Sequence, residues 1–376
     1  MVNYEPKYAK SILNKMKYID SWFWCRYTLN AYNGCEHACT YCDARSDRYY
    51  LHQDFDKKIY IKTNAANLLD SKLKNARSLE KDVIAMAGTS DGYQPAEKTA
   101  ENTKKILQVI LKHGFPVNIS TKNKLIVRDL DIFSEIAKKS WANIAFTITS
   151  VDQDLTSFLE PRASTIEERF SAIKNISHQF PDIKIGINLM PIIPLLHDDH
   201  NDLEELIKKG KEAGAQYILF APGVTLRDNQ GKYFLKRLKK YLERQNKIDL
   251  FHQFVSHFGP EGTHPQAYYH QKNMEVWNLC QKYDMNIEVP RWIPSDYRKE
   301  NYKAAEILLT KARILKFERK PFKDIYWAGM NINNLKQPLG QLHKQGKLKD
   351  ILKSTSRVYS LIQPYIKPPT SLDKFF

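Results

Sequence analysis

Three cysteines lie close together in the N-terminal part of the chain, at positions Cys35, Cys39 and Cys42. Thiolates separated by four and then three residues can ligate three corners of a cubane iron–sulfur cluster. The fourth iron then has no protein ligand and is open to a small molecule. A Cys₃His zinc site that includes His37 is the alternative, although two ligands so close together make an unusual zinc knuckle. The sequence therefore predicts a metal-binding loop, with an iron–sulfur cluster as the favoured occupant.

The elements that must position this loop follow a repeating pattern between residues 82 and 221. Short β-branched or apolar runs alternate with amphipathic stretches of helical period. Strands are expected at residues 25–29, 83–88, 117–121, 144–149, 183–189 and 217–221. Helices are expected at residues 97–113, 131–139, 165–179 and 202–213. About six βα units of this kind predict an α/β fold in which a parallel sheet curls into a partial (β/α)6 barrel of TIM type.

Polar residues stand directly after several of these strands. In βα barrels the chemistry takes place at the carboxyl ends of the strands. The residues at these positions are Thr89, Ser90, Asp91, Lys122, Thr149 and Ser150. The same residue types also occur in plain turns and as helix caps. The position of the residues in the barrel favours a binding site at this edge.

The cysteine loop also resembles a known signature. The spacing C-x3-C-x-aromatic-C, with Tyr41 as the aromatic residue, resembles that of the radical S-adenosylmethionine (SAM) superfamily. The string from Asn33 to Arg45 is similar to the spore photoproduct lyase-like branch, also described as DNA repair photolyase-like. Later landmarks agree in order and spacing over roughly residues 20–230: Ser90-Asp91 with Tyr93-Gln94-Pro95-Ala96-Glu97, Ser120-Thr121-Lys122 with Arg128-Asp129, Glu160-Pro161-Arg162, and Pro191-Ile192-Ile193-Pro194.

The resemblance implies a radical SAM enzyme with two cofactors. Cys35, Cys39 and Cys42 would hold a [4Fe-4S] cluster, and SAM would occupy the open iron. Electron transfer from the cluster would open SAM and give a 5′-deoxyadenosyl radical that abstracts hydrogen from a substrate. An electron donor such as flavodoxin or ferredoxin is an expected partner.

The resemblance also implies residues that contact SAM. Tyr41 would lie along the adenine, and Ile193 would pack against it. Ser90 and Asp91 would bind the amino group of SAM. Lys122 carries a cation suited to its carboxylate.

Three further positions are weaker candidates. Thr149 and Ser150 could hydrogen-bond the ribose hydroxyls, or they could cap the following helix. Arg162 could contact the SAM carboxylate, or it could pair with Glu160 nearby.

Two departures from the resembling group concern the reaction itself. Asp43 stands where the group commonly has tyrosine, and Gly88 stands where the lyases have a cysteine that donates a hydrogen atom. The specific repair reaction is therefore in doubt, and no catalytic residue is assigned. A glycine at this position also leaves space for a different or larger substrate.

The formal net charge is +16, and much of it lies at the C-terminus, where 15 Lys+Arg stand against 5 Asp+Glu from Asn301 onward. A phosphate backbone is one partner for such a patch, so nucleic acid is a candidate substrate or partner. A lysine-rich solvated face is the alternative. A nucleic-acid-binding protein with a structural zinc site is the competing function.

The composition, 42% hydrophobic and 27% charged, is that of a globular protein. A radical SAM core domain with an N-terminal lead-in is expected at residues 1–230, followed by a mostly helical, basic extension at residues 231–376. Cys25 and Cys280 are expected to be core residues. No apolar run is long enough for a membrane span or a signal peptide, so no membrane association and a cytoplasmic location are expected.

Overall fold

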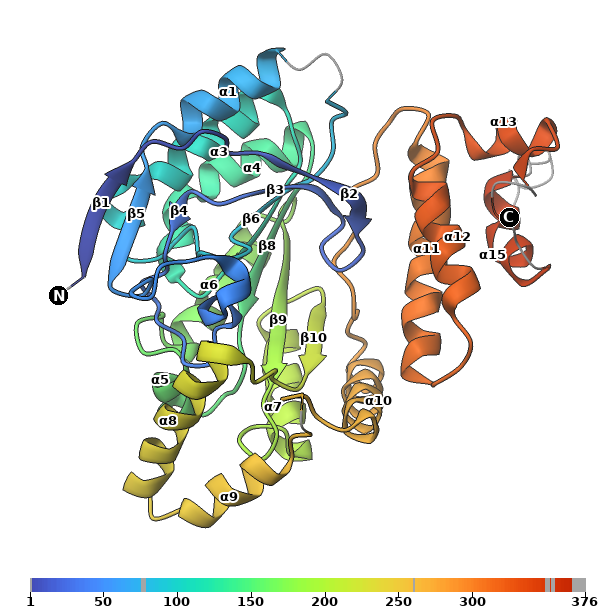
Figure 1. Ribbon diagram of the computed structural model, residues 1–376. Helices are drawn as coiled ribbons and strands as arrows, with labels where there is room; N and C mark the ends of the chain where they lie inside the picture. Colours follow the sequence, from blue (N-terminus) through green and yellow to red (C-terminus); the bar gives the residue numbers. More distant parts are fainter. Residues whose placement is uncertain (1, 76–78, 260, 349–351, 353–355, 367–376) are drawn as a thin grey trace. The chain divides into compact units, whose positions relative to one another are not determined.

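The computed structural model describes residues 2–75, 79–259, 261–348, 352 and 356–366 (Figure 1). The chain divides into two compact units. The first comprises Met1–Lys15 and Cys25–Pro290, and the second comprises Met16–Trp24 and Arg291–Phe376. The boundary expected at residue 230 thus falls inside the first unit.

A parallel sheet forms the centre of the first unit. Its strands in this unit are β3 (Cys25–Leu29), β6 (Ile84–Met86), β7 (Val117–Thr121), β8 (Ala142–Thr147), β9 (Lys184–Ile192) and β10 (Ile218–Pro222). They run side by side in the order β10-β9-β8-β7-β6-β3, and every neighbouring pair is parallel. This sequential order is that of a βα barrel, and the predicted partial barrel is confirmed.

The helices that link these strands also agree with the sequence pattern. They are α3 (Asn102–His113), α4 (Leu130–Lys139), α6 (Ile166–Gln179) and α7 (His200–Glu212). The helix expected at 97–113 is divided into α2 (Glu97–Ala100) and α3. Glu101 between them has a φ of 49°, and the buried Glu97 carboxylate accepts hydrogen bonds from the amides of Thr103 and Lys104 at the start of α3. The division is therefore a capped helix start rather than a kink.

A small sheet precedes the main one and has no counterpart in the sequence predictions. It has the order β1-β5-β4, formed by β1 (Asn3–Lys7), β5 (Lys58–Lys62) and β4 (Tyr32–Asn33). Asn33 in β4 pairs with Tyr60 in β5. Because β4 ends two residues before Cys35, this sheet holds the entry to the cysteine loop. Helix α1 (Ala65–Asn75) follows it.

Helices after the sixth strand complete the first unit. They are α8 (Asp228–Arg244), α9 (Ile248–Ser256) and α10 (Gln266–Lys282). The apolar face of α8, with Phe234 and Leu238, shares one core cluster with Tyr41 and Leu159. This burial explains why the first unit extends past residue 230.

The second unit is mostly helical, as expected for the basic C-terminal part. It contains α11 (Lys299–Phe317), α12 (Lys323–Asn333), α13 (Leu339–Lys344) and α15 (Ser356–Ile366). Strand β2 (Asn14–Asp20) begins in the first unit, and from Met16 onward its residues belong to the second unit. Leu308, Ile325, Leu339 and Ile362 belong to its own apolar core. Among the described residues, no helix is long and apolar enough to cross a membrane.

Candidate functional site

The cysteine loop lies between β4 and the short 3-10 helix η1 (Asp43–Arg45). Two backbone hydrogen bonds fix its course. The amide of Cys35 donates to the carbonyl of Phe55 at 2.8 Å, and the amide of Thr40 donates to the carbonyl of Leu159 at 2.8 Å. Ala38, at the middle of the loop, has a φ of 57°. The loop therefore has a defined turn anchored to two distant segments.

Side chains from other elements hold the loop backbone on both sides of Cys35. The amide of Gln94, which is fully buried, donates from Nε2 to the carbonyl of Gly34 at 3.1 Å. Its Oε1 accepts from the amide of Glu36 at 2.8 Å. Arg162 donates from Nη1 to the carbonyls of Glu36 and Asp56, at 3.1 and 2.9 Å. These contacts pair buried backbone groups that otherwise would be costly to bury.

The later part of the loop is held in the same way. Arg45 donates from Nε to the carbonyl of Cys39 at 3.3 Å, and Gln230 at the start of α8 donates from Nε2 to the carbonyl of Tyr41 at 3.2 Å. The guanidinium of Arg45 also lies 3.7 Å from the ring centroid of Tyr233. Protein groups therefore hold the backbone along the whole length of the loop.

The three thiols are unpaired by disulfides and interact with one another. Burial raises the pKa of Cys39, and the charges of Cys42 and Cys35 raise it further. Burial and the charge of Cys35 raise the pKa of Cys42. Burial also acts to raise the pKa of Cys35, but the hydrogen bond and charge of His37 outweigh it, so the pKa is lowered. Cys35 is thus the thiol most readily ionised for ligation.

This donor set fits a cluster with three thiolate ligands. Three sulfurs come from one short loop, and side chains from outside the loop fix its backbone. Among the residues that the structure describes, no group of three or more His, Cys, Asp and Glu side chains is arranged to hold a single metal ion.

Asp91 binds several neighbours at once. Its carboxylate accepts hydrogen bonds from the amides of Tyr93 and Lys122 and from the hydroxyl of Thr121, at 2.8 to 2.9 Å. It also lies 3.3 Å from Nδ1 of His37. Burial acts to raise the pKa of Asp91, but the charge of His37 outweighs it and lowers the pKa to about 2. Asp91 therefore ties the cysteine loop to the ends of β6 and β7.

Lys122 supplies a partly buried cation beside the cysteine loop. Its Nζ lies 5.9 Å from the centroid of the Tyr41 ring. Burial acts to lower the pKa of Lys122, but the charges of Cys39, Glu160 and Asp91 outweigh it, and the net pKa is raised. The side chain is therefore protonated at neutral pH and suits an anionic ligand group.

Two hydroxyl groups at the carboxyl edge of the sheet have no hydrogen-bond partner among the described atoms. They are Ser90 Oγ and Thr149 Oγ1, on side chains of which no more than 2% of the surface is exposed. Buried hydroxyls without partners are uncommon in native proteins, where a ligand or an ordered water usually supplies the partner. Ser150 differs, because its Oγ accepts from the amide of Asp152, the residue before α5 (Gln153–Leu159).

An ion pair missed by the sequence analysis lies next to the loop. Glu160 pairs with Arg169 of α6 and accepts a hydrogen bond from the hydroxyl of Tyr41. Arg162 instead donates its hydrogen bonds to backbone carbonyls. Ile193 is fully buried in the same core cluster as Cys39 and Tyr41.

Gly88 faces open space. A Cβ atom added to it would meet no heavy atom within 4 Å. The space expected from the missing side chain is therefore present. Asp43, the other departure, accepts a hydrogen bond from the hydroxyl of Tyr49 at 2.8 Å.

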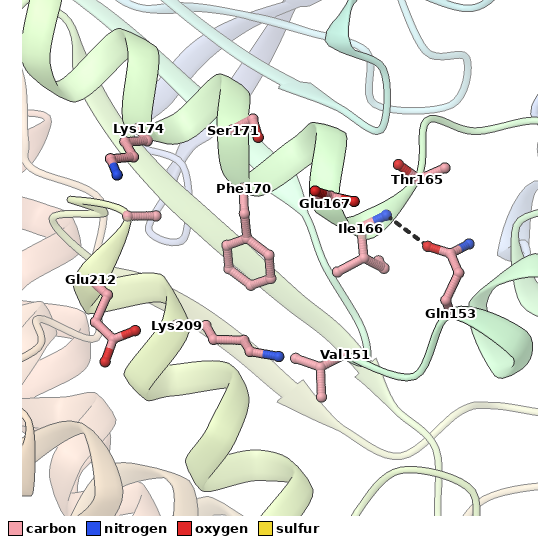
Figure 2. Close-up of a pocket in the computed structure, with 11 residues that line it drawn as sticks. Val151, Gln153, Thr165, Ile166, Glu167, Phe170, Ser171, Lys174, Lys209 and Glu212 are labelled. Atoms are coloured by element: carbon pink, nitrogen blue, oxygen red, sulfur yellow. Dashed lines mark hydrogen bonds between the residues drawn. The ribbon is translucent and has the colours of Figure 1, made fainter.

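A surface pocket of about 540 Å³ lies elsewhere, between α6 and α7. Figure 2 shows the ring of Phe170 and the side chain of Ile166 inside it, with the Gln153 amide accepting a hydrogen bond from the Ile166 amide. None of the predicted site residues lines this pocket. A smaller pocket of about 280 Å³ lies beside η1, between Arg45 and Tyr233.

The fold and the site together are those of an iron–sulfur βα barrel. The sequence matches the radical SAM superfamily over residues 29–195. An uncharacterized protein of Mycobacterium tuberculosis is 30% identical over 238 residues, which cover 62% of this chain and 68% of that protein. An uncharacterized protein of Methanocaldococcus jannaschii is 32% identical over 174 residues, covering 46% and 62%. A variant of spore photoproduct lyase has a similar fold, with a TM-score of 0.53 and 15% identity over 74% of this chain and 79% of that one.

The chain belongs to the radical SAM superfamily. It is a radical SAM enzyme whose cofactors are a [4Fe-4S] cluster and SAM. The membership predicted from the cysteine loop is confirmed.

Lys122 provides a direct test of the SAM site. Because a hydrogen bond to a charged group contributes more than a neutral one, Lys122→Met is expected to weaken SAM binding roughly ten- to a hundredfold. Anaerobic equilibrium dialysis with labelled SAM measures the change. Lys124→Met is the control, since Lys124 is exposed and pairs with Glu168. Equal affinity in the two variants would contradict the assignment.

His197 is expected to make the protein sensitive to acid. It is buried beside the site, and burial lowers its pKa to about 4. Because this value lies below that of an unfolded histidine, the stabilisation is present above about pH 6.5 and is lost towards pH 4, by about 3 kcal/mol. Denaturant unfolding at both pH values measures it. The loss of stability on acidification should be smaller in His197→Gln. Part of the acid sensitivity should remain, because burial also lowers the pKa of His264 to about 4.

Proposed function

We propose that this enzyme abstracts a hydrogen atom from a nucleic-acid or nucleotide-like substrate. When bound, the cluster supplies an electron to SAM, and cleavage of SAM yields the 5′-deoxyadenosyl radical. The observation that carries the proposal is the grouping of Lys122 with the cysteine loop at the carboxyl edge of the sheet. That edge is where βα barrels bind their ligands.

Each polar residue at this edge has a proposed role in holding SAM. Cys35, Cys39 and Cys42 would hold the cluster, and the cluster would bind the amino and carboxylate groups of SAM. Lys122 binds the carboxylate and Ser90 binds the amino group, because the Ser90 hydroxyl is buried without a partner. Thr149 binds a ribose hydroxyl for the same reason.

The remaining predicted residues divide between contact and support. Tyr41 and Ile193 supply an apolar wall for the adenine, since both belong to the core cluster at the loop. Asp91, Arg162 and Ser150 already bind protein groups, so we assign them to positioning. A support role for Asp91 still affects SAM, because it fixes the backbone of Lys122.

The substrate class rests on charge and space. The residues from Asn301 onward, in the second unit, carry much of the positive charge of the chain. Lysine and arginine side chains of this kind bind phosphate backbones. Gly88 leaves room where a bulkier residue would narrow the site. A small iron–sulfur or flavin protein such as ferredoxin or flavodoxin would deliver the electron. Free cysteines suit a reducing compartment, and we propose the cytoplasm.

One anaerobic experiment tests the function. The purified chain is reconstituted with iron and sulfide, reduced, and incubated with SAM and single-stranded or duplex oligonucleotides carrying deuterium. We expect deoxyadenosine, and deuterium within it, by mass spectrometry. Bound zinc without iron, or no deoxyadenosine from an iron-loaded protein, would contradict the proposal. Deoxyadenosine without deuterium from any oligonucleotide would exclude the substrate class.

The role of the second unit is testable by replacing exposed lysines with neutral residues. Deletion is unsuitable, because α11 and α12 share one apolar core. We expect the exposed-lysine variant Lys311→Gln, Lys316→Gln, Lys323→Gln to bind oligonucleotides more weakly. The plot of log affinity against log salt should flatten by about 0.7 to 0.9 for each phosphate that a lysine no longer neutralises. Fluorescence anisotropy measures the slope, and an unchanged slope would show that these lysines serve solubility.

A further inference from the structure

The two faces of the main sheet differ in the size and exposure of their side chains. The face that carries Thr28 and Ala85 is called the inner face. Thr28 and Ala85 are paired across β3 and β6, as are Ser120 and Ala145 across β7 and β8. Paired residues of neighbouring strands point to the same side. Small side chains on this side remain partly exposed although they lie on central strands: Thr28, Ala85 and Ser120. The alternate residues, such as Ile84 and Ile119, are fully buried. Part of this face, at Thr28, Ala85 and Ser120, is therefore accessible.

A closed polar layer forms the floor of this surface. Asn143 donates from Nδ2 to Asn118 Oδ1 at 3.0 Å and to the hydroxyl of Tyr217 at 2.8 Å. The hydroxyl of Tyr217 donates back to Asn143 Oδ1 at 3.2 Å. The Tyr217 ring lies so close to Gly186 that a Cβ there would be 2.4 Å from it. The polar groups of this layer satisfy one another, so the layer needs no ligand.

The next layer towards the cysteine loop is incomplete. Asn188 donates from Nδ2 to Ser120 Oγ at 2.9 Å, across the intervening strand β8. Only 3% of Asn188 is exposed, yet its Oδ1 has no hydrogen-bond partner among the described atoms. Ser120 follows Asn118 by two residues along β7. Ser120 therefore lies about 6 to 7 Å nearer the carboxyl edge of the sheet than Asn118 does. The unpaired Oδ1 of Asn188 and the accessible hydroxyl of Ser120 can therefore both bind a polar group of a ligand.

We propose that Asn188 and Ser120 form a substrate-docking site inside the barrel, one layer beneath the SAM site. The inference rests on the proposed function and deepens it. Asn188 offers an acceptor and one further N–H donor side by side, and Ser120 offers an O–H donor. The complementary ligand group is planar and carries a donor next to an acceptor, as in an amide, an imide or the edge of a nucleobase. Ala85, which is small and partly exposed, leaves room on this face.

Two isosteric probes test the chemical class. Benzamide carries the amide, and acetophenone has the same shape with a methyl group in place of the nitrogen. Binding of each to the cluster-loaded protein is measured by ligand-observed NMR without reductant or SAM. We expect the wild-type chain to prefer benzamide at least tenfold. Asn188→Leu should lose this preference, and Ser120→Ala should reduce it.

A matched variant separates docking from structural support. Asn188→Leu removes the unpaired Oδ1 together with one hydrogen bond to Ser120, so its thermal midpoint should stay close to that of the wild type, with iron content unchanged. Asn143→Leu breaks the closed layer and should lower the midpoint. Equal binding of both probes to the wild type, equal preference in Asn188→Leu, or a midpoint of Asn188→Leu as low as that of Asn143→Leu would overturn the proposal. These readouts do not depend on SAM cleavage, so a failure of the proposed function would appear separately as absent deoxyadenosine.

Discussion

Alanine in place of Cys39 is expected to abolish cluster binding and all formation of deoxyadenosine. Cys39 lies in the middle of the loop, and its thiol interacts with both other thiols. A cubane held by two thiolates lacks the third protein ligand and dissociates. Iron content after anaerobic reconstitution should fall to the background, and the absorbance near roughly 400 nm that thiolate-bound clusters show should disappear.

Cys280→Ala is the matched control for this experiment. Cys280 is fully buried in α10, away from the loop, and burial raises its pKa to about 12. It behaves as a small apolar residue, so its removal should leave the iron content unchanged and cost about 1 kcal/mol of stability. Full iron content in Cys39→Ala, or equal loss of iron in Cys280→Ala, would remove the basis for the assigned ligands.

Methionine in place of Arg169 is expected to lower the free energy of unfolding by about 3 to 5 kcal/mol, because it leaves the buried carboxylate of Glu160 uncompensated. The side chains of Arg169 and Glu160 form an ion pair, and at most 1% of the surface of either side chain is exposed. Glu160 also accepts a hydrogen bond from the hydroxyl of Tyr41. Denaturant unfolding of the apo protein measures the loss. The change should also raise the pKa of Glu160, since Arg169 is the strongest influence that lowers it against burial.

The double variant Arg169→Met, Glu160→Gln should recover part of that loss, since a neutral amide replaces the unpaired charge. Lys124→Met, which breaks the exposed pair with Glu168, should cost less than about 1 kcal/mol. If the double variant is no more stable than Arg169→Met, the loss comes from packing around Arg169 rather than from the charge of Glu160.

The sequence predicts the main sheet well, because each strand is a short apolar run bounded by turn residues. Val117–Thr121 matches its expected range, and the parallel order follows from the alternation with helices. The small sheet with β1, β4 and β5 is not predictable in this way. Its strands carry charged residues such as Lys58 and Lys62, and β4 has only two residues, so no apolar run marks it.

The site is predicted where the chemistry is local and missed where it depends on distant contacts. The cysteine spacing is visible in eight consecutive residues. Gln94 binds backbone groups of Gly34 and Glu36 about sixty residues away, and no local pattern indicates this. Asp91 and Arg162 have the residue types of ligand-binding groups, and only the structure shows that protein groups already occupy them.

The boundary expected at residue 230 lies where the βα alternation ends and basic helices begin. The compact first unit instead continues to Pro290. Composition changes at α8, but the apolar stripe of α8 packs on the loop and on α5. A change of composition along a chain therefore does not by itself mark the end of a compact unit.

Because Gln94, Arg162, Arg45 and Gln230 hold the backbone between Gly34 and Tyr41, side chains outside the cysteine motif set the course of the segment that carries Cys35 and Cys39. A substitution of any one of these four side chains would then disturb the cluster indirectly, although none of them carries a sulfur.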